Sequence, residues 1–326
     1  MKPLNVAITG AAGQISYSLL MQIAQQGMAN KRCVNLSLID LPNYAKQLEG
    51  VVMELNDTAS PYINSIRFGS DINKLFEGVE FVFFIGAKPR GKGETRADLM
   101  SANFDIFRKQ GEVVDAVCSD DLKVLVVGNP CNTNCWVLSQ FTSRYPKNRF
   151  HAMTRLDQHR AMAMASSYFQ KPVSKLKSAV IWGNHSATQV PDIYHCTTEH
   201  PEISWMRNTL LPNVQNRGAQ IIEYRGLSSA GSAAYGALKA ADDLLLPTKS
   251  GHYYSTATYD MHNTFGLDND LVFSYPARTL ETGEVVLCEE IRWPEYFNDD
   301  IQRTVQELQN EKALVENLLK TTGGSR

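Results

Sequence analysis

Residues 4–16 read LNVAITGAAGQIS, an apolar segment of six residues that runs directly into a turn with two glycines. An apolar strand followed by such a turn and by a helical pattern is typical of the start of a doubly wound α/β domain. Gly10 permits the tight turn, and Gly13 lets backbone amides at the helix N-terminus approach a pyrophosphate. Ser16 stands where a third glycine is usual, so the pattern alone also fits an ordinary turn.

An acidic residue follows the second apolar segment. Val34–Ile39 ends in Asp40, whose carboxylate is placed to accept hydrogen bonds from the adenine-ribose hydroxyls and to repel a 2′-phosphate. The alternative is that Asp40 is only a turn residue before Pro42. Because strand, glycines and acid occur in register, the sequence predicts a dinucleotide site that prefers NAD to NADP.

Residues 1–150 alternate apolar segments with helical patterns. Continuous Val, Ile, Leu and Phe segments between helices are typical of a parallel sheet that is covered on both faces. We therefore expect an N-terminal doubly wound parallel sheet (Rossmann) in an α/β protein. The expected strands are 4–9, 34–39, 79–85 and 123–127, and the expected helices are 14–27, 44–57 and 97–118.

The pattern changes after Phe150. Longer helices there accompany shorter, turn-separated strands, which favours an α+β domain. We expect an NAD-binding domain at 1–150 and a catalytic or substrate domain at 151–326. The expected helices of the second domain are 155–169, 205–225, 232–246 and 299–319, and its strands lie near 252–259, 271–278 and 283–288.

Composition excludes several classes of protein. With 32 basic and 34 acidic side chains, the net charge of −2 leaves no basic excess to bind nucleic acid. The longest apolar segment, near Phe81–Ile85, is too short to span a membrane. Six cysteines in 326 residues do not resemble a disulfide framework, and Cys131 and Cys135 lack a second pair that would complete a metal site. We expect a cytoplasmic protein without a metal, acting on a small molecule.

Four segments of the sequence carry side chains of the types that catalysis or substrate binding uses. Asn129 follows the strand at 123–127, Asp157 and Arg160 share a helix face, and His185 follows a short apolar segment. A basic, glycine-bearing loop over 87–96 contains further arginines. Each has a purely structural alternative: a turn, an exposed ion pair, a structural histidine or a solvated loop.

Taken together, the motifs resemble the lactate/malate dehydrogenase family, and within it the cytosolic-type malate branch. The most specific are Gly128-Asn-Pro-Cys-Asn-Thr-Asn134 and Trp182-Gly-Asn-His-Ser186. The resemblance implies an NAD-dependent enzyme, most simply a homodimer, that reversibly oxidises (S)-malate to oxaloacetate. It extends over Thr9–Ile15, Pro89–Leu99, Val126–Cys135, Thr154–Arg160, Ile181–Asp192 and Leu227–Ala234.

The resemblance also implies a role for each matching residue. His185 is the expected acid/base, Asp157 orients it, and Asn129 lies near both substrate and nicotinamide. Histidine suits this role because it titrates near neutral pH. The substrate is held by Arg90, Arg96 and Arg160, with Asn129. The cofactor is held by Gly10, Gly13, Gln14, Ile15, Asp40, Gly86, Asn103, Val127, Asn129 and Ser229.

Arg90 decides the expected substrate. A dicarboxylate needs a cation for each of its two carboxylates, because an unpaired buried charge is costly. Lactate-selective members of the family carry an uncharged residue at this place, so Arg90 favours malate.

Three other functions are compatible with parts of the sequence. The nearest is a lactate or other 2-hydroxy-acid dehydrogenase. A short-chain dehydrogenase would use Tyr235 and Lys239, a pair that fits helix packing better. The third is a dinucleotide-binding protein without catalytic activity, which nothing in the sequence supports, because every residue that the chemistry requires is present.

Overall fold

The computed structural model describes residues 2–88 and 96–321. Within them the chain divides into two compact units. Unit 1 comprises Met1–His151 and Asn310–Arg326, so far as these ranges are described, and unit 2 comprises Ala152–Gln309. This division differs from the expected 151–326 domain in its last segment. Buried Glu311 receives a hydrogen bond from Thr133, and both residues belong to unit 1.

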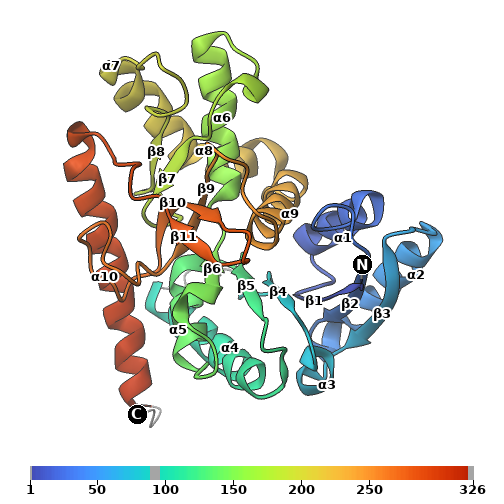
Figure 1. Ribbon diagram of the computed structural model, residues 1–326. Helices are drawn as coiled ribbons and strands as arrows, with labels where there is room; N and C mark the ends of the chain where they lie inside the picture. Colours follow the sequence, from blue (N-terminus) through green and yellow to red (C-terminus); the bar gives the residue numbers. More distant parts are fainter. Residues whose placement is uncertain (1, 89–95, 322–326) are drawn as a thin grey trace. The chain divides into compact units, whose positions relative to one another are not determined.

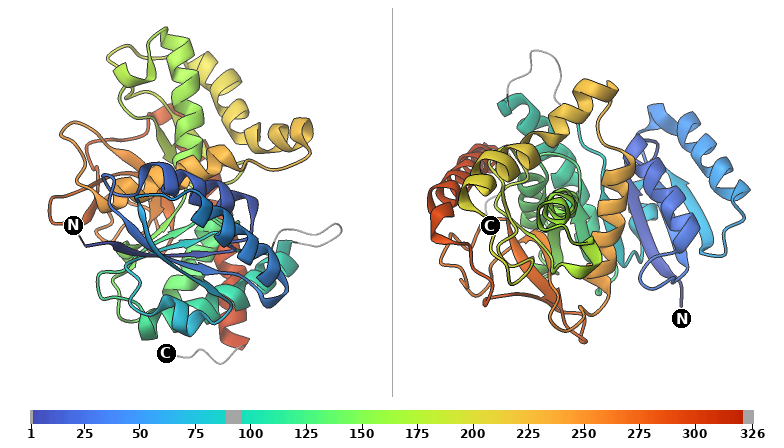
Figure 2. Two further views of the ribbon diagram at one scale, coloured as in Figure 1. Left: turned by 90° about the vertical axis from the view of Figure 1, so that its right-hand side faces the viewer. Right: turned by 90° about the horizontal axis from the view of Figure 1, so that it is seen from above.

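A parallel sheet forms the centre of unit 1, as the sequence predicted. Its strand order is β6-β5-β4-β1-β2-β3, and the pairs β1·β2, β1·β4, β2·β3 and β4·β5 are parallel. Figure 2 (left) shows α1 and α2 on one face of this sheet and α4 and α5 on the other. The strands are β1 (Leu4–Thr9), β2 (Val34–Ile39), β3 (Ile63–Gly69), β4 (Phe81–Phe84), β5 (Lys123–Val126) and β6 (Phe150–Ala152). The helices are α1 (Gln14–Gln26), α2 (Ala45–Asp57), α3 (Ile72–Phe76), α4 (Arg96–Val117) and α5 (Cys131–Gln140).

The strand order contains a switch point at β1. This strand lies between β2 and β4, so the chain proceeds from β1 toward one edge of the sheet and returns to build the other half (Figure 1). Open α/β sheets bind ligands at the carboxyl ends of the strands where the order reverses. The turn after β1 therefore occupies the favoured place for a ligand.

Some elements of unit 1 were not predicted. β3, α3, α5 and β6 are all absent from the sequence-based assignment. In α5, nine of its ten residues are buried, so it lacks the apolar stripe by which a surface helix is recognised. In β3, polar side chains interrupt the apolar pattern and no residue is fully buried.

Unit 2 combines helices with antiparallel strands, again as predicted (Figure 1). The expected helix at 205–225 is in fact a short helix, a π-helical turn at Met206–Leu210 and then α8. The helices are α6 (Arg155–Phe169), α7 (Ile203–Trp205), α8 (Leu211–Arg225), α9 (Gly231–Leu245) and α10 (Asn298–Thr321), which continues into the last segment of unit 1. The strands are β7 (Val180–Trp182), β8 (Val190–Asp192), β9 (Tyr254–Thr258), β10 (Phe273–Thr279) and β11 (Val285–Leu287).

Buried aromatic side chains fill the core of unit 2. Trp182, Phe273 and Tyr275 are fully buried, and the Phe273 and Tyr275 ring centroids are 4.8 Å apart. This core packs around β7, and His185 lies in the loop that follows this strand. Of the helices in the described part of the chain, none has the length and apolarity that crossing a membrane requires.

Candidate active site

The turn after β1 is built so that only glycine fits. Gly10 has a φ of +64°, and a Cβ added there would lie 2.7 Å from Cα of Gly86. A Cβ on Gly86 would in turn lie 2.9 Å from the Gly10 nitrogen. The Gly86 N–H donates to the carbonyl of Thr9 at 3.1 Å. The backbones after β1 and β4 are therefore in direct contact, which leaves an open surface without side chains.

The N-terminus of α1 is left open beside this turn. Gly13 is the N-cap, no side chain caps the helix, and its first turn holds no acidic residue. The amides of Gln14 and Ile15 have no intrahelical partner, and the helix dipole adds partial positive charge there. Ser16, at the third glycine position, is fully buried and its hydroxyl has no hydrogen-bond partner among the described residues.

Asp40 lies directly against the glycine turn. Its Oδ2 accepts a hydrogen bond from the Ala12 amide at 2.8 Å, and its Oδ1 accepts one from the Leu41 amide at 2.8 Å. Each carboxylate oxygen keeps a further lone pair for a ribose hydroxyl. The open helix end, the side-chain-free turn and this carboxylate fit the pyrophosphate and adenine ribose of NAD.

The other predicted residues of unit 1 differ in exposure. Asn103 is fully buried, and its amide is used on the backbone: its Oδ1 accepts from the Lys88 N–H at 2.9 Å, and its Nδ2 donates to the Leu99 carbonyl at 3.0 Å. Val127 is buried, whereas Asn129 is exposed just past β5. Asn103 thus fixes the backbone at the start of the predicted arginine loop.

Arg90 lies outside the described residues, as does the side chain of Arg96, the first residue of α4. Their roles remain predictions from the sequence.

In unit 2, a buried carboxylate joins the predicted catalytic residues. Asp157, in the first turn of α6, has no exposed surface. Its Oδ2 lies 2.5 Å from Nδ1 of His185, and its Oδ1 accepts from Nη1 of Arg160 at 2.8 Å. Nη2 of Arg160 lies 3.4 Å from the hydroxyl of Ser229. The alternative of an exposed helix pair is therefore wrong, because Asp157 is buried between His185 and Arg160.

This arrangement shifts the pKa of both partners. Burial alone would lower the pKa of His185, but the charge of Asp157 and its hydrogen bond raise it above the ordinary value. Burial alone would raise the pKa of Asp157, but His185 and Arg160 lower it below the ordinary value. The pair therefore favours an imidazolium next to a carboxylate, which is what an acid/base catalyst that works in both directions needs.

The loop that carries His185 is held by α10. Gly183, with a φ of +95°, packs so closely on Thr304 that any Cβ would overlap it. The Asn184 amide donates to Oγ1 of Thr304 at 2.9 Å. These contacts fix the backbone on the N-terminal side of His185.

Glu307, one turn further along α10, holds the loop on both sides of His185. Its Oε2 accepts from Nδ2 of Asn184 at 3.0 Å, from the hydroxyl of Ser186, and from Oγ1 of Thr188 at 2.6 Å. Sequence reasoning missed Glu307, because an acidic residue on an amphipathic helix gives no sign of a partner about 120 positions earlier.

Tyr235 and Lys239 pack as the helix interpretation predicts. The Tyr235 ring lies 5.4 Å from the His159 ring, and Lys239 pairs with Asp242 at 3.0 Å, on the same helix. No group of three or more His, Cys, Asp or Glu side chains in the described ranges is placed to hold a metal ion.

Comparison with known proteins decides the family. Residues 4–151 match the lactate/malate dehydrogenase NAD binding domain, and residues 154–319 match the lactate/malate dehydrogenase alpha/beta C-terminal domain. The chain belongs to the lactate/malate dehydrogenase family. It is therefore an NAD-dependent oxidoreductase, and the short-chain dehydrogenase interpretation is excluded.

Full-length relatives belong to the same family. A malate dehydrogenase of Protochlamydia amoebophila is 39% identical over 327 positions, which cover 98% of this chain and 99% of that protein. A malate dehydrogenase of Chlamydia felis is also 39% identical, over 96% of this chain and 98% of that protein.

Two solved structures of the lactate/malate dehydrogenase family share the fold over nearly the whole chain. The malate dehydrogenase of Naegleria fowleri has a TM-score of 0.92 at 36% identity and covers 98% of this chain and 99% of its own. Trichomonas vaginalis lactate dehydrogenase, in complex with NADH and oxamate, has a TM-score of 0.91 at 29% identity, with the same coverage.

Proposed function

We propose that the chain is a malate dehydrogenase that reversibly oxidises (S)-malate to oxaloacetate, with His185 as the acid/base. The observation that carries this proposal is Asp157, a buried carboxylate that contacts both His185 and Arg160. Of its two partners, His185 can exchange a proton, and Arg160 can bind a carboxylate of the substrate. The names of the full-length relatives support malate as the substrate.

His185 moves the proton of the reaction. Asp157 accepts the Nδ1 hydrogen, so Nε2 is the ring nitrogen proposed to exchange a proton with the substrate. Neutral His185 takes the hydroxyl proton of malate at Nε2, and the imidazolium returns it to oxaloacetate in reverse. NAD, when bound, supplies the acceptor for the hydride that leaves the same carbon.

Arg160 binds one carboxylate of the substrate. Among the described residues, its N–H groups donate only to Asp157 and Ser229, so the remaining donors can form a forked pair with a carboxylate. We propose that Arg90 binds the second carboxylate, that Arg96 polarises the reacting carbonyl, and that Asn129 contacts the substrate.

Unit 1 is proposed to bind NAD through the turn after β1. Gly10, Gly13, Gln14 and Ile15 would face the pyrophosphate, and Asp40 would bind the adenine ribose. Gly86, Asn103, Val127, Asn129 and Ser229 are proposed as further cofactor contacts, with Asn103 acting through the Lys88 backbone that it holds.

A substrate comparison tests this function. Purified enzyme is assayed for NADH oxidation with oxaloacetate, pyruvate and phenylpyruvate in parallel, and oxaloacetate should give the highest kcat/KM. A preference for pyruvate would contradict the proposal and favour the lactate dehydrogenase alternative. The structural similarity to the Trichomonas lactate dehydrogenase is the observation that supports this alternative.

We further propose a cytoplasmic homodimer that serves the tricarboxylic acid cycle, whose C4 dicarboxylates this reaction interconverts. Exposed apolar side chains support an assembly surface, since Leu41 and Met53 are 63% and 58% exposed. Light scattering coupled to size-exclusion chromatography should give twice the chain mass, and a monomer would contradict the dimer.

A further inference from the structure

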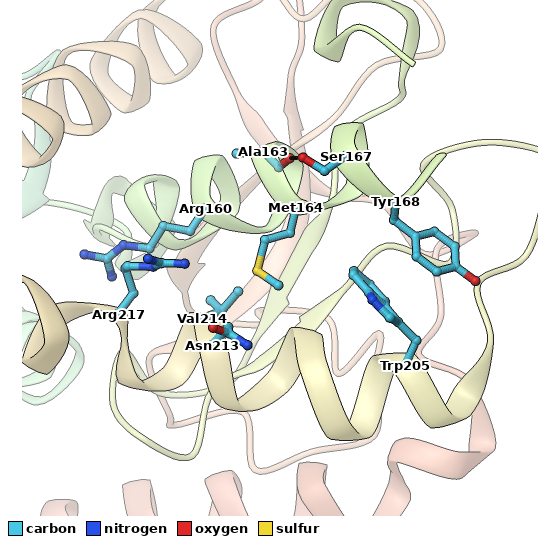
Figure 3. A pocket seen from close by; sticks show the side chains of 9 residues that line it. All are labelled: Arg160, Ala163, Met164, Ser167, Tyr168, Trp205, Asn213, Val214 and Arg217. Carbon is cyan, nitrogen blue, oxygen red and sulfur yellow. Dashed lines mark hydrogen bonds between the residues drawn. The ribbon is translucent and has the colours of Figure 1, made fainter. Parts of the chain in front are cut away.

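A groove in unit 2 lies between α6 and the segment α7–α8, with a cavity of about 490 Å³ (Figure 3). This volume falls within the range of small-molecule sites. Arg160 lines the groove and also belongs to the proposed active site, whereas His185 and Asp157 do not line the groove. The groove is thus separate from the proton-transfer atoms, although it shares one arginine with them.

One end of the groove is cationic. Arg160 and Arg217 both lie at this end in Figure 3. Within the described chain, the Arg217 guanidinium makes no hydrogen bond or ion pair, whereas Arg160 is paired with Asp157. The two guanidinium groups outnumber the one carboxylate that pairs with either of them in the described chain, that of Asp157, so this end of the groove carries a net positive charge. A guanidinium with free donors is well suited to a carboxylate ligand.

The opposite end of the groove is aromatic. Trp205 and Tyr168 pack together there, with ring centroids 4.3 Å apart. The Tyr168 hydroxyl accepts a hydrogen bond from the Glu202 amide at 3.0 Å, which holds the ring in place. Met164 and Val214 line the groove between its two ends. The groove therefore offers an apolar wall that leads toward the two arginines.

We propose that this groove binds an organic monoanion with an aromatic or similarly apolar body. The carboxylate pairs with Arg217 and Arg160, and the body lies along Met164 and against Trp205. The binding itself does not depend on the proposed function. Its kinetic consequence does: because Arg160 is also proposed to bind substrate, an occupied groove raises the KM for oxaloacetate.

A calorimetric titration tests the binding, with 4-phenylbutyrate as the probe and the full chain without cofactor. Two analogues separate the contributions: 4-phenyl-1-butanol keeps the body without the charge, and butyrate keeps the charge without the ring. We expect one saturable site for 4-phenylbutyrate and affinities lower by about tenfold or more for both analogues, because each lacks one half of the recognition. No saturable binding, or equal binding of the alcohol, overturns the proposal.

Variants locate the site. Arg217→Gln and Trp205→Leu should each weaken binding of 4-phenylbutyrate by about tenfold, since each removes one end of the groove. Arg225→Gln, which removes an exposed arginine of the same helix, is the matched control and should leave it unchanged. Arg90→Gln should also leave the affinity for 4-phenylbutyrate unchanged. This variant would weaken binding of the probe only if the probe occupied the proposed substrate site. Circular dichroism checks the fold of each variant.

Two further outcomes are decisive. If folded Arg217→Gln and Trp205→Leu bind as the unmodified chain does, the probe binds elsewhere and the groove is not the site. In the NADH assay, 4-phenylbutyrate should raise the KM for oxaloacetate in the unmodified enzyme but not in Arg217→Gln. If the chain proves to have no malate dehydrogenase activity, the proposed function fails, and the calorimetric result still decides the groove.

Discussion

Asp157 contacts His185 and Arg160 with its two oxygens and has no exposed surface, so its charge acts on His185 with little screening. The pKa of His185 is raised as a result. Oxaloacetate reduction needs the imidazolium, so its kcat/KM should fall as the pH rises through this raised pKa. Malate oxidation needs neutral His185, so its kcat/KM should fall as the pH drops below the same value.

Replacing Asp157 tests this cause directly. Asp157→Asn removes the charge, so the pH at which oxaloacetate reduction is lost should move down, and kcat should fall by at least about a hundredfold. Steady-state rates from pH 5 to 10 in both directions measure both effects, with His185→Gln as the inactive reference. A profile that keeps its midpoint in Asp157→Asn would show that Asp157 does not set the pKa of His185.

Arg90 carries the choice between substrates. Arg90→Gln should lower kcat/KM for oxaloacetate by about a hundredfold or more, because the second carboxylate loses its cation. The loss for pyruvate, which has no second carboxylate, should be small. Parallel NADH assays with both oxo acids measure the ratio. Equal losses on the two substrates would show that Arg90 does not recognise the second carboxylate.

At the scale of elements, α10 determines where His185 lies. Glu307→Gln removes the charge that holds Asn184, Ser186 and Thr188, so His185 should move away from Asp157. We expect kcat to fall by between about tenfold and a hundredfold, with the KM for NADH unchanged, because a small misplacement of a catalytic group is costly. The pH midpoint of oxaloacetate reduction should move down as well.

A second acidic residue of α10 provides the matched control. Within the described residues, the only ion pair of Glu316 is with Lys312, at 3.9 Å, and Glu316→Gln should leave kcat and the pH profile unchanged. A fall in kcat for Glu307→Gln without any change in the pH midpoint would contradict a role in positioning His185.

The elements that the sequence predicted are those with a local signal. The strands β1 and β2 have the predicted bounds because each is a short apolar segment with turns at both ends. The helix α5 has no such signal, since burial on all sides removes its periodicity. The loop of His185 was found from its motif. Glu307 matters through partners that are distant along the chain, and Arg217 lies near Arg160 only because the fold brings the two together.

At the scale of the whole molecule, stability should depend on pH through histidines that are buried in the neutral form. Burial lowers the pKa of His151 to about 3, and that of His159 to about 4. Unfolding restores their ordinary pKa values, so below about pH 6.5 these two histidines bind more protons in the unfolded chain than in the folded one. Their contribution to the free energy of unfolding should therefore decrease as the pH falls below this value.

His151 should account for about 2 kcal/mol of that decrease between pH 7 and pH 5. Urea titrations of the full chain at several pH values measure the slope of unfolding free energy against pH. In His151→Gln this slope should be smaller, whatever the absolute stability of the variant. His252→Gln, which replaces an exposed histidine, is the control and should keep the original slope. An equal slope in His151→Gln would mean that His151 takes up its proton in the folded protein as readily as in the unfolded chain.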